Sequence, residues 1–368
     1  MYIHEQLNWP DLHWDAAKLA GPLAEVRHLQ GRQIGRMQSL GFQLREEAAL
    51  QMLTQDVVKT SEIEDENLDT LQVRSSIARR MGLDAGGLPT VDRNVEGIVE
   101  VMFDATNAYD LPLTAERLFG WHAALFPTGR SGRQRITVGG WRKDANGPMQ
   151  VISGPYGRET VHFEAPAHER LEGELARFLE WFNTPSTTDP VIRSALAHFW
   201  FVTLHPFEDG NGRIARAIAD SVLARSERSP QRFYSMSSQI QQDRKAYYDV
   251  LEWSQKGSLD VTTWIEWFLG CLQRAIQASE GTLQSILTKA RFWETHAGQP
   301  INSRQRLLLN RLLDGFEGKL TSSKWALIAK CSQDTALRDI GDLVELGMLV
   351  RQEAGGRSTS YQLMMPKP

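Results

Sequence analysis

The fold of this chain depends on one stretch, His205-Pro-Phe-Glu-Asp-Gly-Asn-Gly-Arg-Ile-Ala-Arg216. It combines a histidine, acidic side chains, two glycines, an amide and two arginines. Residues 194–204, which precede it, are apolar enough to form a buried helix, and Ile214 and Ile218 continue behind it at helical spacing. The sequence therefore predicts a polar loop held between two core helices.

The loop has the composition of a polyphosphate site. Gly210 and Gly212 allow backbone conformations that are closed to other residues and let a ligand come close. The loop leads into the N-terminus of a helix, where free N–H groups and the helix dipole attract anions. Arg213 and Arg216 are three residues apart and fall on the first turns of that helix. Each feature alone is commoner as a plain turn or a solvated helix face, but together they predict a phosphate cradle with His205 at its mouth.

The stretch resembles the signature of Fic-domain proteins, His-Pro-Phe-x-(Asp/Glu)-Gly-Asn-Gly-Arg-x-x-Arg, without departure. An N-terminal helical segment and a C-terminal module extend the resemblance to a bacterial subgroup of this family over nearly the whole chain. The resemblance implies a protein adenylyltransferase that moves AMP from ATP to a Ser, Thr or Tyr hydroxyl of a target protein, uses Mg²⁺ and releases pyrophosphate. It also implies a mainly α-helical fold with a Fic-type core and a small β-hairpin flap.

The resemblance also assigns roles to the residues of the loop. His205 is the expected general base, because a pKa near ~6.5 leaves much of the imidazole neutral at cell pH. Asp209 is the expected Mg²⁺ ligand, since this ion prefers oxygen donors. Phe207 is the expected buried anchor of the loop. The expected ligands of ATP are Gly210, Asn211, Gly212, Arg213, Arg216, Tyr247 and Tyr248. Aromatic residues at helical spacing are more often core than base pocket, so the two tyrosines keep both interpretations.

Composition narrows the class of protein. The chain has 368 residues, 41% hydrophobic and 23% charged, which is typical of a globular protein with two or three domains. A formal net charge of −4 gives no general attraction to nucleic acid or anionic membranes. Cys271 and Cys331 form no metal or redox motif, and the N-terminus has no signal pattern. Because the apolar stretches are too short to span a bilayer, we expect a cytoplasmic protein without a membrane partner.

The chain divides into three expected parts. Residues 1–90 form an N-terminal helical segment that ends in the glycine-rich break 82–89. Residues 91–294 form the Fic core. Residues 295–368 form a winged-helix-like domain with three helices and two strands around the turn 354–357. The expected recognition helix carries Arg338 among several acidic residues, so it suits a protein or a second subunit in a homodimer as well as DNA.

A small β element interrupts the helical core. Residues 136–141, 149–153 and 160–163 are short and rich in β-branched or aromatic side chains, and Asn146-Gly147 is a strong hairpin turn. Fic proteins carry a flap of this kind that holds the target by main-chain hydrogen bonds. We expect the flap at Val161, His162 and Phe163. A purely structural hairpin is the alternative for residues 136–153.

A second resemblance lies near the end of the N-terminal segment. Thr60-Ser-Glu-Ile-Glu-Asp65 is similar to the inhibitory pattern (Ser/Thr)-x-x-x-Glu-(Gly/Asn) of many Fic proteins, with Asp65 in place of the last residue. It implies that Glu64 pairs with Arg216 and keeps the γ-phosphate out. An acidic cluster in a solvated turn is the alternative.

Other functions stay open at the level of sequence. The chain is compatible with a DNA-binding regulator whose Fic core senses a nucleotide, and with transfer of another nucleotide or phosphate-containing group. Glu64 is also compatible with orienting water for the removal of AMP, and self-modification is compatible with the same site. The sequence names neither the target protein nor the modified residue.

Overall fold

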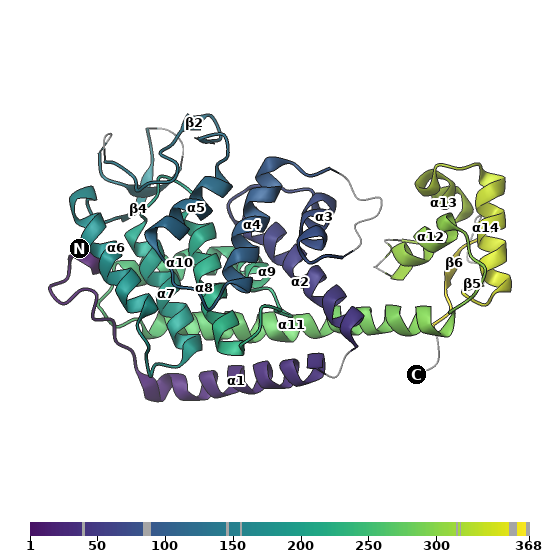
Figure 1. Ribbon diagram of the computed structural model, residues 1–368, viewed down its shortest axis with the longest axis horizontal. Helices are drawn as coiled ribbons and strands as arrows, with labels where there is room; N and C mark the ends of the chain where they lie inside the picture. Colours follow the sequence, from purple (N-terminus) through teal and green to yellow (C-terminus); the bar gives the residue numbers. More distant parts are fainter. Residues whose placement is uncertain are drawn as a thin grey trace. The chain divides into compact units, whose positions relative to one another are not determined.

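The computed structural model describes residues 1–38, 41–83, 90–144, 147–154, 157–313, 316, 318–352 and 359–365. The chain separates into two compact units (Figure 1). The first contains Met1–Gly41 and Arg45–Ser279, and the second contains Phe42–Leu44 and Glu280–Pro368. The N-terminal segment and the expected core thus share one unit. The expected divisions at residues 90 and 295 stay predictions, and most of the 82–89 break lies outside the described residues.

The first unit is mainly α-helical, as predicted. After a 3₁₀ turn at Ile3–Glu5 it contains α1 (Ala16–Gln38), all but the first residues of α2 (Phe42–Ile63), α3 (Thr70–Arg80), α4 (Arg93–Asn107), α5 (Ala115–Leu125), α6 (His168–Asn183), α7 (Pro190–Leu204), α8 (Asn211–Glu227), α9 (Met236–Gln242), α10 (Arg244–Gln255) and the first half of α11 (Thr262–Thr295). None of the helices in the described part of the chain is long and apolar enough to cross a bilayer.

The helices α7 and α8 form the centre of this unit and hold the polar loop between them (Figure 1). Asp189 caps α7 by accepting from the N–H of Val191, and Pro190 follows at the first helical position, where no N–H is needed. Nearly every residue of α7 is buried, and the first residues of α8 are buried as well. The predicted pair of core helices around the loop is therefore present.

The β structure of the first unit differs in part from the prediction. β3 (Gln150–Ser153) pairs with β4 (Thr160–Glu164) in an antiparallel hairpin, and β1 (Arg130–Ser131) pairs with β2 (Gln134–Arg135). The strand predicted at residues 136–141 is wrong. Thr137 of this stretch instead donates its hydroxyl to Glu208 of the polar loop (2.7 Å). Asn146 of the predicted turn lies outside the described residues.

The second unit has its own core. It contains the end of α11, then α12 (Ser303–Leu313), α13 (Ser322–Ala329), α14 (Gln333–Glu345) and the antiparallel strands β5 (Leu349–Arg351) and β6 (Tyr361–Leu363). Trp325 and Leu343 are fully buried in it. Asp339 of α14 is also buried, and it accepts from Arg304 at 2.9 and 3.0 Å. Asp339, an acid of the expected recognition helix, therefore contributes to the packing of this unit through its ion pair with Arg304. The winged helix stays a prediction, and the turn 354–357 lies outside the described residues.

We expect Gly97→Ala to destabilise the first unit. A Cβ at Gly97 on α4 would lie 1.8 Å from the carbonyl oxygen of Ala124 on α5, so the two helices would have to separate. Over-packing of this kind costs typically about 1–3 kcal/mol in the free energy of unfolding. Gly120→Ala on α5 is the matched control: its Cβ meets no atom within 4 Å, and alanine there adds about 0.5–1 kcal/mol of stability. Urea denaturation measures both. A Gly97→Ala protein with wild-type stability would contradict the close approach of α4 and α5.

Candidate active site

His205 ends α7 where the chain turns into the loop. Its backbone has φ 47° and ψ 56°, a left-handed conformation that residues other than glycine adopt rarely. Its N–H still donates to the carbonyl oxygen of Phe201 at 3.1 Å, which closes the last helical turn. A left-handed residue at this place stops the helix, and the chain leaves it as the loop 206–210.

Arg142 holds the main chain of this loop, although the sequence did not single it out. Its Nε donates to the carbonyl oxygen of His205 (2.8 Å), and its backbone N–H donates to that of Pro206 (2.9 Å). The guanidinium is 1% exposed and is neutralised by Asp144. No sequence pattern marks this contact, because its main-chain acceptor lies 63 residues away along the chain.

The His205 imidazole is held in its neutral form. Burial, together with the nearby charge of Arg142, lowers the pKa of His205 from 6.5 to about 4. Its Nδ1 lies 3.4 Å from the carbonyl oxygen of Val202. A proton on Nδ1 would be donated there and would leave Nε2 as the basic nitrogen. The side chain can therefore accept a proton at pH 7 without first losing one.

The floor of the loop is fixed by aromatic stacking and an amide clip. Phe207 is fully buried, as predicted for an anchor, and stacks on His122 with ring centroids 4.1 Å apart. The Asn211 side chain accepts from the N–H of Phe207 (3.0 Å) and donates to its carbonyl oxygen (2.8 Å). The amide of Asn211 thus faces the loop, and its contact with a phosphate stays a prediction.

Asp209 presents a partly exposed carboxylate at the mouth of the loop. One oxygen accepts from the N–H of Gly210 at 2.6 Å, and the other accepts from the Ser131 hydroxyl. No group of three or more histidine, cysteine or acidic side chains able to hold a metal occurs within the described ranges. A single carboxylate nevertheless fits Mg²⁺ when water and phosphate oxygens complete its shell. Asp209 is therefore a candidate ligand for Mg²⁺ bound with a nucleotide.

Glycine is required at the two signature positions for different physical reasons. Gly210 has φ 80°, which favours glycine, and a Cβ there would lie 2.9 Å from the ring of Phe126. Gly212 lies within α8, but a Cβ there would be 2.3 Å from Oε1 of Glu64. A carboxylate oxygen thus occupies the space that any other residue at position 212 would fill.

Both signature arginines are buried and both bind the end of α2. Arg216 is 2% exposed, and its guanidinium donates to the Thr60 hydroxyl (2.7 Å), the Thr60 carbonyl oxygen (2.9 Å) and Oε1 of Glu64 (2.7 Å). Arg213 is 4% exposed and donates to Glu66 at 2.5 Å. Burial and the Glu64 carboxylate act in opposite directions on Arg216, and its pKa is raised overall. Glu64 thus contacts Arg216, the partner that the sequence predicted for it.

Comparison with known proteins identifies the core of this site. Residues 112–223, which contain most of α8 and all of the polar loop, match the Fic/DOC family. The chain contains a Fic domain. Residues 2–83 match a separate family described as a domain of unknown function, DUF4172. Residues 60–65, which resemble the inhibitory pattern, lie in this second match and outside residues 112–223.

Curated relatives carry the name protein adenylyltransferase Fic. The protein of Nematostella vectensis is 35% identical over 117 residues, which cover 31% of this chain and 25% of that protein. The protein of Culex quinquefasciatus is 24% identical over 225 residues, which cover 58% of this chain and 39% of that protein. The chain therefore spans between a quarter and two fifths of the length of these relatives.

Two solved structures share the fold. A Fic family protein from Desulfovibrio desulfuricans G20 aligns with a TM-score of 0.55 at 21% identity and covers 98% of this chain and 100% of its own. A Fic domain-containing signaling protein from Bacteroides thetaiotaomicron VPI-5482 aligns with a TM-score of 0.51 at 17% identity, over 71% of this chain and 98% of its own. At these identities the likeness concerns the fold alone.

Three consecutive acidic residues after α2 bind arginines of α8 and α10. Glu64 and Glu66 bind Arg216 and Arg213, and Asp65 between them makes two 2.7 Å contacts with Arg244 of α10. Asp65 has φ 59°, so this position requires a left-handed backbone. Glycine and asparagine adopt that conformation most readily, and aspartate also tolerates it. The departure of Asp65 from the inhibitory pattern is thus compatible with the geometry that the pattern needs.

The two candidate base-pocket tyrosines differ in exposure. Tyr247 is 1% exposed, and its hydroxyl lies 2.9 Å from Nε2 of the buried His198. Tyr248 of α10 is 39% exposed and lies beside the end of α2, with its hydroxyl 3.5 Å from the carbonyl oxygen of Ile63. Of the two, Tyr248 is exposed enough to contact a ligand, whereas Tyr247 is buried; the role of both in binding ATP stays a prediction.

The three expected flap residues also differ in exposure. Val161 is 39% exposed on β4, whereas Phe163 is 1% exposed and packs against the ring of Tyr2. The His162 ring lies between the Ser153 hydroxyl and Glu252, at 2.6 Å from each. The pairing register shifts between Val151 and Ile152, and Val161 is the most exposed of the three side chains. The docking role of all three stays a prediction.

We expect the imidazole of His205 to stay neutral across the ordinary pH range in the absence of nucleotide. Its lowered pKa, about 4, means that protonation competes with burial until the medium is strongly acidic. Proton NMR of the histidine C2 signals should show that the signal lost in His205→Asn does not titrate between pH 8 and about pH 5.5. A midpoint near the ordinary value of 6.5 would contradict the uncharged state.

Proposed function

We propose that this protein transfers AMP from ATP to a Ser, Thr or Tyr hydroxyl of a target protein and releases pyrophosphate. The main support is the convergence of a neutral histidine with two buried arginines on one glycine-bearing loop at the start of α8. The name of the curated relatives, protein adenylyltransferase Fic, agrees with this chemistry.

The triphosphate would bind at the N-terminus of α8. The N–H groups of Asn211, Gly212 and Arg213 in the first turn of α8 would bind the α- and β-phosphates, whereas the N–H of Gly210 donates to Asp209. The helix dipole favours negative charge there. Arg213 and Arg216 would take the β- and γ-phosphates by charge-assisted hydrogen bonds. Arg213 Nε and Arg216 Nη1 are buried and have no hydrogen-bond partner among the described residues. Such unsatisfied donors favour an anionic ligand.

His205 would act as the general base. Its neutral imidazole takes the proton of the target hydroxyl as the hydroxyl oxygen bonds to the α-phosphorus, and the bond from that phosphorus to the bridging oxygen of the β-phosphate breaks. Pyrophosphate leaves opposite the incoming oxygen. Arg142 is a positioning residue, because it fixes the main chain of His205. Mg²⁺ held by Asp209 would neutralise phosphate charge.

The remaining parts of the substrate would lie on either side of this centre. Tyr248, exposed beside the end of α2, suits stacking against the adenine. The β3–β4 hairpin suits a target segment in extended conformation, because Ile152 and Val161 expose apolar side chains there, at 54% and 39%. Strand addition of this kind relies on main-chain hydrogen bonds and tolerates varied target sequences.

The structure represents an inhibited state in this proposal. Glu64 holds Arg216 and Glu66 holds Arg213, so both arginines that would bind the β- and γ-phosphates already carry carboxylates. ATP could then bind only with its terminal phosphates displaced, and its α-phosphate would miss in-line attack. Removing the carboxylates would open the cradle. A role of Glu64 in orienting water for removal of AMP is a further part of this proposal.

We expect His205→Ala to abolish covalent labelling of protein from α-labelled ATP while ATP still binds. The substitution removes the base and leaves the arginines in place, and loss of a general base lowers rates by about 10²–10⁴-fold. Labelling of a cell lysate and calorimetric binding of ATP measure the two properties separately. Wild-type labelling by the variant would disprove the assigned role, and absence of labelling in the wild type under all conditions would disprove the proposed function.

We expect Glu64→Gly to raise self-labelling from α-labelled ATP by about tenfold to a hundredfold. This range corresponds to loss of one charge-assisted contact of roughly 1.5–3 kcal/mol. Glu62→Gly is the matched control, because Glu62 lies on the same helix but pairs with Lys59 (2.6 Å). Glu66→Gln should raise the rate less than Glu64→Gly, since the side chain of Glu66 is 46% exposed and its ion pair is screened. Equal rates for Glu64→Gly and the wild type, with ATP binding intact, would rule out inhibition by Glu64.

A further inference from the structure

The first residues of the chain form a strap across the first unit. Residues 2–13, the strap, are largely irregular, and Figure 1 shows them leading from the side of α6 to α1. At one end Arg170 of α6 donates to the carbonyl oxygen of His4 (3.1 Å). At the other end His13 exchanges main-chain hydrogen bonds of 3.0 and 2.9 Å with the segment before α11. Ile3 is fully buried, so the strap is packed against the unit along its length.

The strap holds the base of the β3–β4 hairpin. The rings of Tyr2 and His4 both meet the ring of Phe163 edge to face, with centroids 5.2 and 5.7 Å away. Nε2 of His4 lies 2.8 Å from the carbonyl oxygen of Glu164. Because a carbonyl oxygen can only accept, this nitrogen is the donor and carries the proton of the ring. Two neighbouring residues of β4 are thus fixed by two residues of the strap.

His4 makes this contact as a neutral donor. It is 5% exposed, and burial lowers its pKa below 6.5, so the imidazole carries a single proton at pH 7. Its Nδ1 is buried and has no hydrogen-bond partner in the described part of the chain. The polar contribution of His4 to the hairpin is therefore the one N–H on Nε2, which the side-chain amide of a glutamine can also supply.

The hairpin is more exposed towards its turn than at its base. Ile152 and Val161 are 54% and 39% exposed, whereas Phe163 is 1% exposed. Between them His162 contacts Glu252 of α10 at 2.6 Å, and both of these side chains are about a third exposed. A two-stranded hairpin is marginally stable by itself, so its direction depends on the contacts at its base.

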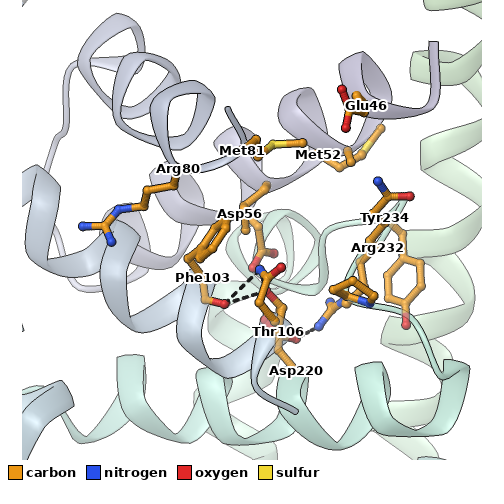
Figure 2. A pocket seen from close by; sticks show the side chains of 15 residues that line it. Glu46, Met52, Asp56, Arg80, Met81, Phe103, Thr106, Asp220, Arg232 and Tyr234 are labelled. Carbon is orange, nitrogen blue, oxygen red and sulfur yellow. Dashed lines mark hydrogen bonds and ion pairs between the residues drawn. The ribbon is translucent and has the colours of Figure 1, made fainter. Parts of the chain in front are cut away.

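The strap and the end of α2 belong to one matched family, residues 2–83. Between them α2 has an anchor of its own, because Asp56 accepts from hydroxyl and N–H groups at the start of α9. Figure 2 shows Asp56 beside the ion pair of Asp220 with Arg232. Loosening of the strap therefore leaves the end of α2, with Glu64, in place.

We propose that the strap positions the flap for the target protein, with Tyr2 and His4 as positioning residues that act through Phe163 and Glu164. This role rests on the proposed function, in which the β3–β4 hairpin holds the target segment. The target hydroxyl must meet the α-phosphorus within a narrow range of geometries. A flap with a loosened base presents its strand in that geometry less often, so the affinity for the target falls and ATP binding does not change.

The two ends of residues 2–83 then act on the two substrates. The strap controls how the target is held, and Glu64 at the other end controls how the triphosphate is held. The role of this domain is thus not confined to inhibition, because its first residues support the reaction that its last residues oppose.

Hydrogen exchange of the full chain, followed by mass spectrometry, tests the contact without any substrate. We expect His4→Ala to speed exchange of residues 160–164 by about tenfold or more, since one hydrogen bond and one aromatic contact are lost. Exchange of α7 should keep its wild-type rate. His4→Gln should restore most of the protection. Leu7→Ala is the matched control on the strap, because Leu7 is 99% exposed, and it should change nothing. Tyr2→Ala provides the same test if His4→Ala does not fold.

The effect on the target has a separate readout. In the Glu64→Gly chain, the concentration of lysate protein that gives half-maximal labelling from α-labelled ATP should rise severalfold when His4→Ala is added. The rise reflects the fraction of molecules with a displaced flap. The half-saturating concentration of ATP should stay the same, and His4→Gln and Leu7→Ala should leave both concentrations near those of the parent.

Unchanged exchange of residues 160–164 in the folded strap variants, or faster exchange that extends equally to α7, would overturn the strap as the support of the flap. Equal loss of protection in His4→Gln and His4→Ala would overturn the hydrogen bond as its cause. Faster exchange with an unchanged half-saturating concentration of lysate protein would overturn the role towards the target alone. Failure of all labelling would contradict the proposed function and leave the hydrogen-exchange result standing.

Discussion

The buried guanidinium of Arg216 is the constraint on which the rest of the site depends. A charge that is 2% exposed must be met by acceptors, because an unpaired ion inside a protein is very costly. Thr60 and Glu64 supply these acceptors, and both belong to the end of α2. Docking of α2 on α8 is therefore an electrostatic requirement of the free protein. In the proposed function a triphosphate would replace the Glu64 carboxylate, because it offers oxygens of the same charge to the same guanidinium.

The parts of the site that are local in sequence could be predicted. The apolar runs on either side of the loop predicted α7 and α8, because burial on all sides leaves a near-continuous hydrophobic pattern. The left-handed backbone at Gly210 follows from its dipeptide context, whereas the buried Phe207 was expected from the resemblance. The pairing of Glu64 with Arg216, although 152 residues apart, was accessible through a resemblance rather than through physics.

The parts that depend on tertiary docking could not be predicted. Arg142 acts on main-chain oxygens, which carry no sequence identity, so nothing in its neighbourhood marks it. Both hydrogen bonds of the Asn211 side chain are made with the main chain of Phe207. They depend on the backbone path of the loop, which the sequence does not show. Residues 136–141 have strand-like composition but pair with no strand among the described residues, and Thr137 binds the loop instead. Propensity describes a segment, whereas pairing depends on what the fold brings beside it.

Glycine at position 212 meets two separate requirements, the close approach of a ligand and the close approach of Glu64. Its Cα faces Oε1 of Glu64 so closely that a Cβ would lie 2.3 Å from it. A protein that never met a nucleotide, but still used this carboxylate to neutralise Arg216, would need glycine here for steric reasons alone. The identity of residue 212 is therefore over-determined, and its presence in a signature does not by itself separate proteins that carry out catalysis from those that retain only the closed arrangement.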